Sequence, residues 1–300
     1  MRPDFLVIGH VVQDLIDGPG APGRAGWRLG GTASYAALLA ARLGLRAAVL
    51  TAASPDLPLA EALPGVEVVR AAGDRTTQIR NVYDGGRRRQ HIPQRAASVT
   101  AAALPDEWRS VPIVLLGPVA AEVHDDLAAC FPSSLAGLSA QGWLRRIGPA
   151  ASGGRVRPVS PERWNAEPFL RRVRALFVSD EDLAPEQAAA ALARWSGQVE
   201  VVAFTHGERG AEVCHRGAWR RVDAFPARAV DPTGAGDVFA AAFLIRLHES
   251  ADIWQAARFA ACAASFAVEG EGTTSLPDRA MIESRLREHP DIVPRPVEEG

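Results

Sequence analysis

The stretch "AVDPTGAGDVFAAAF", residues 229–243, sets two glycines and an aspartate directly before an apolar run. Val230 and its neighbours are typical of a strand end, and Pro232 and Gly234 forbid its continuation. Residues 238–243 are typical of the buried face of a helix. The stretch therefore predicts a strand, a glycine turn and a helix. Because the N–H groups of such a turn and the helix dipole favour negative charge at one spot, we expect an anion to bind there.

Asp237 lies in the first turn of this expected helix, and two interpretations of it are open. A carboxylate at that position can simply cap the helix, which is common. Alternatively, Gly234 and Gly236 clear the space that a phosphoryl group needs, which leaves Asp237 at its rim as a candidate proton acceptor.

The bulk composition is that of an ordinary α/β protein. A chain of 300 residues with 47% hydrophobic content can bury one large core, or two smaller ones, without disulfides or metal. The net charge of -2 and the scattered arginines give no reason to expect a nucleic-acid or membrane partner. The 3 cysteines are far apart, which favours neither a disulfide frame nor a zinc site, and reducing cytoplasm is the simplest location.

The chain contains no lysine, since all 33 residues counted as Lys+Arg are arginine. A Walker A lysine and a lysine Schiff base are both excluded, and pyridoxal-phosphate enzymes with them. A bound phosphate must therefore be held by backbone N–H groups, by arginine or by a metal ion.

Apolar runs alternate with Ala-, Leu- and Arg-rich runs, which predicts a mostly parallel sheet with helices on both faces. The expected strands are 5–9, 47–53, 66–72, 113–118, 135–140, 175–180 and 199–207. Residues 14–30, rich in Gly and Pro, and residues 75–92, which contain an Asp-Gly-Gly turn, break this rhythm and predict a small separate sheet. We expect a looser insertion at 141–172 and an irregular tail from residue 289.

Two further stretches carry candidate binding residues. Gly30-Gly31 opens an expected helix and lets a ligand approach the backbone, although a plain turn is the simpler interpretation. Asp14, just past the expected first strand, lies where open α/β sheets bind ligands.

The order and spacing of four features resemble the ribokinase-like, or PfkB-type, carbohydrate kinase family. The four features are Asp14, Gly30-Gly31, "THGERG" at 205–210 and "DPTGAGD" at 231–237. The resemblance covers nearly the whole chain. It implies a single domain, 1–300, with a three-layer α/β/α Rossmann-like fold and a β-sheet lid formed by segments near 14–30 and 75–92. It also implies transfer of the γ-phosphoryl group of ATP to a hydroxyl of a small neutral sugar or polyol.

The resemblance also assigns roles to individual residues. The N–H groups of the catalytic turn would form an anion hole, and Asp237 would deprotonate the acceptor hydroxyl. Asp182 would help to organise Mg²⁺ through water, with helix capping as the alternative. A monovalent cation near Asp231, a loop at 270–277 over the adenine and a homodimer through the lid are further implications. The anion-hole residues are Gly234, Ala235 and Gly236; the acceptor-binding residues are Asp14, Gly30, Gly31, Ser34 and Tyr35; the nucleotide-binding residues are Thr205, Gly207, Gly210 and Thr233.

The sequence departs from the family at Tyr35, where an Asn that binds sugar hydroxyls is usual. The acceptor is therefore open between an inositol-like polyol, a free sugar, a nucleoside and a sugar phosphate. The carboxylate of Asp14 favours a neutral acceptor, whereas Arg80 and the arginines at 87–89 would suit a second phosphate. A catalytically silent sugar-binding regulator is the rival from another class. A nicotinamide-dependent oxidoreductase is disfavoured because no GxGxxG follows the first strand.

Overall fold

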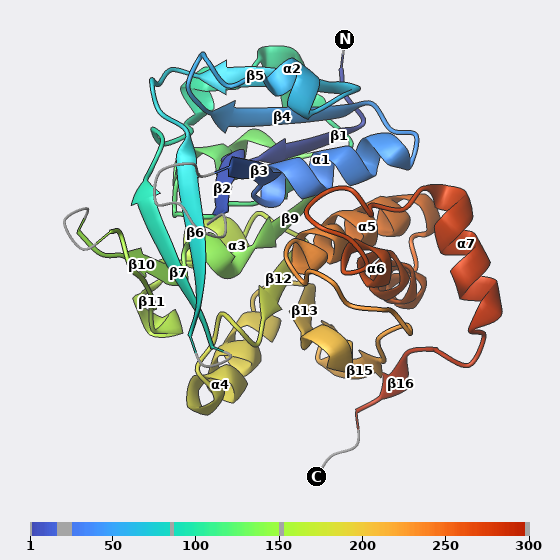
Figure 1. The fold of residues 1–300 in the computed structure, drawn as a ribbon. Helices are drawn as coiled ribbons and strands as arrows, with labels where there is room; N and C mark the ends of the chain where they lie inside the picture. Colours follow the sequence, from blue (N-terminus) through green and yellow to red (C-terminus); the bar gives the residue numbers. More distant parts are fainter. Residues whose placement is uncertain (1, 17–25, 85–86, 150–152, 298–300) are drawn as a thin grey trace.

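The computed structural model describes residues 2–16, 26–84, 87–149 and 153–297. Within them a 10-stranded sheet forms the centre of the molecule (Figure 1). Its first seven strands are parallel, and the last three are antiparallel. In spatial order they are β5 (Val66–Ala71), β4 (Ala47–Ala52), β1 (Phe5–Ile8), β8 (Ile113–Leu116), β9 (Leu135–Ser139), β12 (Ala175–Ser179), β13 (Val201–Thr205), β14 (Ala211–His215), β15 (Ala218–Val222) and β16 (Arg295–Pro296).

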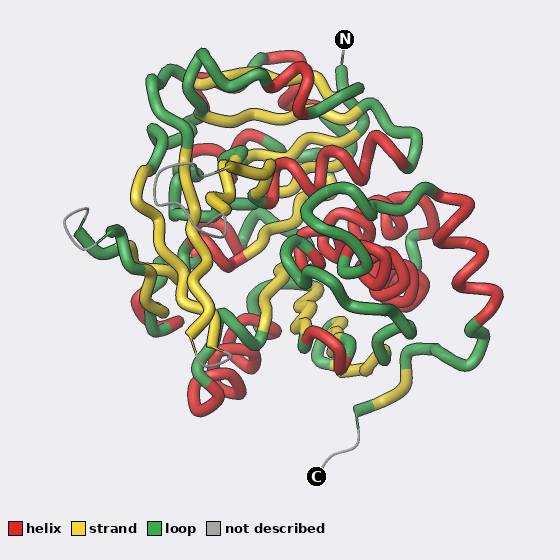
Figure 2. The backbone as a smooth tube through the Cα atoms, viewed as in Figure 1, coloured by secondary structure: helices red, strands yellow, loops and turns green. Residues whose placement is uncertain are grey.

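Both faces of this sheet are covered, as the alternation of runs predicted. Along β1, Phe5 and Val7 enter one apolar cluster, while Leu6 and Ile8 enter the other. The helices over the first face are α1 (Thr32–Arg42), α2 (Leu59–Ala62), α5 (Ala235–Ser250), α6 (Ile253–Ala267) and α7 (Arg279–Glu288). Of these, α5, α6 and α7 lie together at the right of Figure 2. The second face is covered by α3 (Glu167–Leu170), α4 (Pro185–Ser196) and the 3-10 turns η1 (Ala101–Ala103), η2 (Asp106–Ser110) and η3 (Asp125–Cys130).

The two segments that interrupt the α/β rhythm form a separate four-stranded sheet, called the lid below. Its strand order is β3 (Gly26–Gly30), β2 (Val12–Ile16), β6 (Thr77–Asp84), β7 (Arg87–Gln94). Asp14 is therefore inside a lid strand, and the expectation that it follows the first strand of the main sheet is corrected. One face of the lid packs through Ile79 and Ile92 against Val119 and Ala120.

A buried polar network fixes the base of the lid. His10, between β1 and β2, is fully buried, with Nδ1 2.7 Å from Oγ1 of Thr77 and Nε2 2.8 Å from the carbonyl of Ala97. The carboxylate of Glu122 accepts the His10 N–H at 2.8 Å and the N–H groups of the turn at 119–120. Because an unpaired buried polar group is costly, these bonds hold the lid strands in one register.

The insertion at 141–172 is indeed made of short elements. They are η4 (Ala140–Gly142), β10 (Arg145–Ile147), β11 (Val156–Pro158), η6 (Pro161–Arg163) and α3. Strands β10 and β11 pair with each other, and their Ile147 and Val156 pack against the lid cluster.

Two expectations along the C-terminal part of the chain are wrong. Val230 ends no strand: β15 stops at Val222, and Val230 is 57% exposed in an irregular segment. Its N–H and that of Asp231 both donate to the carbonyl of Val268, so a loop and not a strand partner takes these bonds. The tail is also not wholly irregular, because Arg295 and Pro296 form β16 against β15.

Across the described residues, no helix combines the length and apolar character needed to span a bilayer. The three cysteines, Cys130, Cys214 and Cys262, are free and buried.

Candidate active site

Two helices begin side by side at the centre of the molecule. Helix α5 starts after Gly234, whose φ is 82°, and α1 starts after Gly31, whose φ is 85°. Oγ1 of Thr32, at the start of α1, donates a hydrogen bond of 2.7 Å to Oδ1 of Asp237 in the first turn of α5. Because the first N–H groups of a helix lack intrahelical partners, the paired helix ends make a positive electrostatic site beside an acidic side chain.

The carboxyl of Asp237 is held in an unusual environment. Burial is the main cause that raises its pKa from an ordinary 3.8 to about 6, and the nearby Asp182 adds to the rise. The Thr32 hydrogen bond and the positive charge of Arg145 act in the opposite direction. The bond to Thr32 also argues against the capping interpretation, since the N-cap Gly234 has no side-chain cap and Asp237 is directed to a neighbouring helix.

The two glycines of the turn have different functions. A Cβ on Gly234 would lie 2.3 Å from Cε1 of Tyr35, and its φ is one that side chains disfavour, so Gly234 is required twice over. Gly236 is exposed, and a Cβ there would meet nothing within 4 Å. A side chain at Gly236 would therefore meet no steric obstacle, in contrast to one at Gly234. The space beside Gly236 is open, as the expectation of a phosphoryl group at this turn requires.

The acceptor-side residues surround Tyr35, which is 1% exposed. Burial raises the pKa of Tyr35, and the carboxylates of Asp14, Asp237 and Asp231 raise it further. Asp14 lies against Gly30, where a Cβ would come 2.1 Å from its Oδ2. The structure thus brings Asp14, Gly30, Gly31 and Tyr35 to the side of Asp237.

Ser34 does not lie at the surface of the site. It is fully buried, and its hydroxyl donates a 2.7 Å hydrogen bond to the carbonyl of Gly30. The expectation that its hydroxyl contacts the acceptor is corrected, because the bond to Gly30 already occupies it. Ser34 instead holds the di-glycine turn in place.

The candidate nucleotide residues lie at the end of β13, in the turn between β13 and β14, and in the turn before α5. Thr205 ends β13 and is followed by η7 (Gly207–Arg209) and by Gly210. Gly210 has a φ of 89°, and a Cβ on it would lie 2.2 Å from the carbonyl oxygen of Val222, so only glycine fits there. Arg209 donates a 2.8 Å bond to Asp180, which ties this turn to the one after β12. Thr233 lies in the α5 turn, where its N–H donates to Oδ1 of Asp231 at 3.0 Å.

Asp182 is 7% exposed, and its Oδ2 accepts the N–H of Ser179 at 3.1 Å. Burial raises its pKa, while Arg145 and the Ser179 bond lower it. It does not cap α4, whose N-cap is Ala184, so the capping alternative for Asp182 is not supported. Arg145, in β10, was missed by sequence reasoning, because no motif marks an arginine within a loose insertion.

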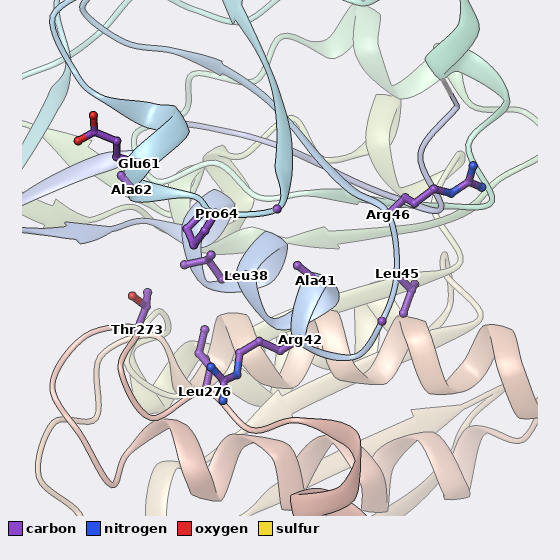
Figure 3. Close-up of a pocket in the computed structure, with 12 residues that line it drawn as sticks. Leu38, Ala41, Arg42, Leu45, Arg46, Glu61, Ala62, Pro64, Thr273 and Leu276 are labelled. Carbon is purple, nitrogen blue, oxygen red and sulfur yellow. The ribbon is translucent and has the colours of Figure 1, made fainter.

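A surface pocket of about 710 Å³ lies away from these residues (Figure 3). Aliphatic side chains such as Leu38 and Leu276 line it, with Arg42 pointing across toward Leu276. It contains none of the predicted site residues. We place the candidate site at Asp237 instead, because carboxylates, glycines and helix N-termini converge there and not in the pocket.

Comparisons with known proteins match one part of this chain to a family model and to curated relatives. Residues 173–279 match the family model of the pfkB family carbohydrate kinases. A nucleoside kinase of Methanothermobacter thermautotrophicus is 44% identical over 79 residues, 26% of this chain and 25% of its own length, so the chain matches about a quarter of that relative.

Solved structures match over nearly the whole chain. A pyrophosphate-dependent kinase of the ribokinase family, in complex with a pyrophosphate analog and myo-inositol, has a TM-score of 0.75 at 23% identity and covers 93% of this chain and 99% of its own. Arabidopsis thaliana ribokinase with ribose and ATP has a TM-score of 0.72 at 22% identity and covers 96% and 99%.

The fold is thus that of the ribokinase family. Residues 173–279, which include the turn before α5, match the pfkB family carbohydrate kinases, so the resemblance seen in the sequence is confirmed over that part of the chain.

The two glycines of the turn give a first prediction. Gly234→Ala should lower the free energy of unfolding by about 2–5 kcal/mol, from the unfavourable φ and the collision with Tyr35. Gly236→Ala should fold at least as stably as the unmodified chain, yet lose about tenfold or more in phosphoryl transfer because its methyl enters the phosphate space. Urea unfolding and initial rates measure the two effects, and equal stabilities of the variants would contradict the assignment.

The Thr32 bond gives a second prediction, in the pH profile. The resemblance assigns Asp237 as the proton acceptor, and a base must be ionised to act, so kcat/KM should fall below a pH of about 6. Thr32→Val removes a bond that favours the ionised form, so this acid limb should move to higher pH, while Thr32→Ser should leave it in place. A limb that does not respond to Thr32→Val would show that Asp237 is not the titrating group.

Proposed function

We propose that this protein is an ATP-dependent kinase that phosphorylates a hydroxyl of a small neutral sugar or polyol. The observation that carries the proposal is the carboxyl of Asp237, with its pKa raised to about 6, at the N-terminus of α5 beside an open glycine turn. A base whose pKa is near the working pH is suited to take the proton of an alcohol as it is phosphorylated.

The reaction follows from the placement of these groups. Asp237 accepts the hydroxyl proton, the acceptor oxygen bonds to the γ-phosphorus, and the bond to the bridging oxygen of ATP breaks to release ADP. The N–H groups of Gly234, Ala235 and Gly236, with the dipole of α5, stabilise the negative charge of the transferring group. Arg145 adds a positive charge on the side of Asp182 and Asp237.

Mg²⁺ fits the carboxylate oxygens available at this site. The described residues contain no cluster of three or more His, Cys, Asp or Glu placed to hold a metal, and Mg²⁺ commonly binds through one or two carboxylates and the substrate phosphates. Asp182 is the carboxylate that would reach it through water. When bound, the ion neutralises charge on the β- and γ-phosphates.

The acceptor class rests on Asp14. An ionised carboxylate accepts hydrogen bonds from hydroxyls and repels a neighbouring phosphate. The acceptors to be compared are those of the similar proteins. They are myo-inositol, from a pyrophosphate-dependent kinase, ribose, from a ribokinase, and nucleosides, from a nucleoside kinase. The free, buried cysteines suit the reducing cytoplasm that we propose as the location.

A third prediction tests the activity itself. The purified chain should phosphorylate at least one acceptor from a panel of inositols, pentoses, hexoses, nucleosides and sugar phosphates. ATP and pyrophosphate are compared as donors. Addition of a chelator should abolish turnover. Asp237→Asn should lose about 10²- to 10⁴-fold in rate because an amide cannot accept the proton.

Stability supplies the control for that variant. Because folding raises the pKa of Asp237 from 3.8 to about 6, its ionisation opposes folding at pH 8, and this cost is lost as the pH falls below the ordinary value. Asp237→Asn should therefore melt no lower than the unmodified chain at pH 8. The proposal is contradicted if Asp237→Asn keeps a tenth of the rate, or if the unmodified chain turns over no acceptor. Binding of an acceptor without turnover would favour the catalytically silent sugar-binding regulator.

A fourth prediction concerns the acceptor. Asp14→Ala should raise the KM for the acceptor about tenfold, the effect of a lost charged hydrogen bond, with little change in the KM for ATP. Gln13→Ala, the adjacent lid residue bonded to Gln78, is the matched control and should change neither. Efficient use of a sugar phosphate together with an indifferent Asp14→Ala would rule out a neutral acceptor held by Asp14.

A further inference from the structure

The carboxylate of Asp231 joins two loops beside the anion-binding turn. Its Oδ1 accepts the N–H of Thr233 at 3.0 Å, and its Oδ2 accepts that of Gly272 at 3.5 Å. The N–H groups of residues 230 and 231 also donate to Val268 at 2.7 and 3.2 Å. The position of the turn before α5 therefore depends on how the charge of Asp231 is balanced.

A cation already lies at this position, and it belongs to the lid. Nη1 of Arg28, in β3, is 3.7 Å from Oδ2 of Asp231 and 3.1 Å from Oε2 of Glu271. This nitrogen is buried, and the Arg28 stem runs along the loop, with its Cδ 3.9 Å from where a Cβ on Gly272 would lie.

The residues around Asp231 therefore do not fit a monovalent cation. Such an ion is held by carbonyl and carboxylate oxygens, and beside a guanidinium it would be repelled. The arginine is anchored on its own strand as well, since Arg28 is paired across the sheet with Asp14. The charge of Arg28 opposes the rise in the pKa of Tyr35, so Arg28 lies within electrostatic range of that residue.

We propose that Arg28 supplies, from within the chain, the positive charge that neutralises Asp231, so that the protein needs no added monovalent cation. In this position Arg28 is a positioning residue. It connects the lid strand that carries it to the turn before α5 and to the 270–277 loop. The kinetic part of this inference rests on the proposed kinase function, whereas its structural part does not.

The first experiment needs no substrate. Thermal unfolding of the full chain is measured in potassium chloride and in choline chloride at equal ionic strength. The unmodified chain should melt within about 1 °C in the two salts, because no specific ion binds. The melting temperature of Arg28→Gln should be lower in choline chloride and should return to that of the unmodified chain in potassium chloride. Arg28→Lys should melt as the unmodified chain does in both salts. The control is Arg171→Gln, which breaks the exposed pair with Glu167 and should gain no potassium dependence.

The second experiment uses whichever acceptor is phosphorylated. The kcat/KM for the donor should be equal in both salts for the unmodified chain and should fall about tenfold for Arg28→Gln in choline, with Arg28→Lys restoring it. Stabilisation of the unmodified chain by potassium over choline by more than about 2 °C, or an Arg28→Gln variant unchanged in melting, would overturn the inference. Since melting is measured without turnover, an inactive protein would refute the proposed function and leave the test of Arg28 intact.

Discussion

The hydrogen bond between Thr32 and Asp237 is the contact on which the site depends. It ties the start of α1 to the start of α5, two helices that are 205 residues apart at the bonded positions. Each helix begins after a glycine with positive φ, so the backbone turns sharply and directs its first N–H groups toward the same region. The ring of Tyr35 on Gly234 locks the two turns together from the apolar side.

The lid completes this arrangement through charge. Asp14 and Arg28 lie opposite each other on adjacent lid strands, one facing the acceptor side and the other reaching Asp231 and Glu271. Below them, His10 and Glu122 hold the lid base to the main sheet with buried bonds. The same sheet thus carries an acidic and a basic group to two different parts of the site, and a rigid base fixes where each arrives.

Much of the fold followed from local signals in the sequence. Six of the seven parallel strands are mainly apolar runs between turn residues, whereas the edge strand β5 contains Glu67 and Arg70. Residues 238–243 are buried as expected because α5 packs against the sheet, α1 and α6. Asp237, the two glycine turns and Asp14 were found because their residue types at short spacing have few other uses. Ion pairs such as Arg28 with Asp231 could not be found, since their partners are distant in sequence and depend on tertiary packing. The sequence does not reveal that Gly234 and not Gly236 has positive φ. Ser34 was misjudged because the hydrogen-bond partner of a hydroxyl is set by the fold.

The contact between Tyr35 and Gly234 also limits how the protein can evolve. Tyr35 lies on the proposed acceptor side and Gly234 in the proposed phosphate turn. Because the two residues are in contact, substitutions at these positions are expected to be strongly non-additive. A smaller residue at position 35 would remove the collision and leave only the backbone preference for glycine. A new acceptor specificity that replaces the tyrosine would thus have to come first, and only then would the turn tolerate a side chain. The contact between the Tyr35 ring and Gly234 therefore restricts the order in which mutations at these two positions can accumulate.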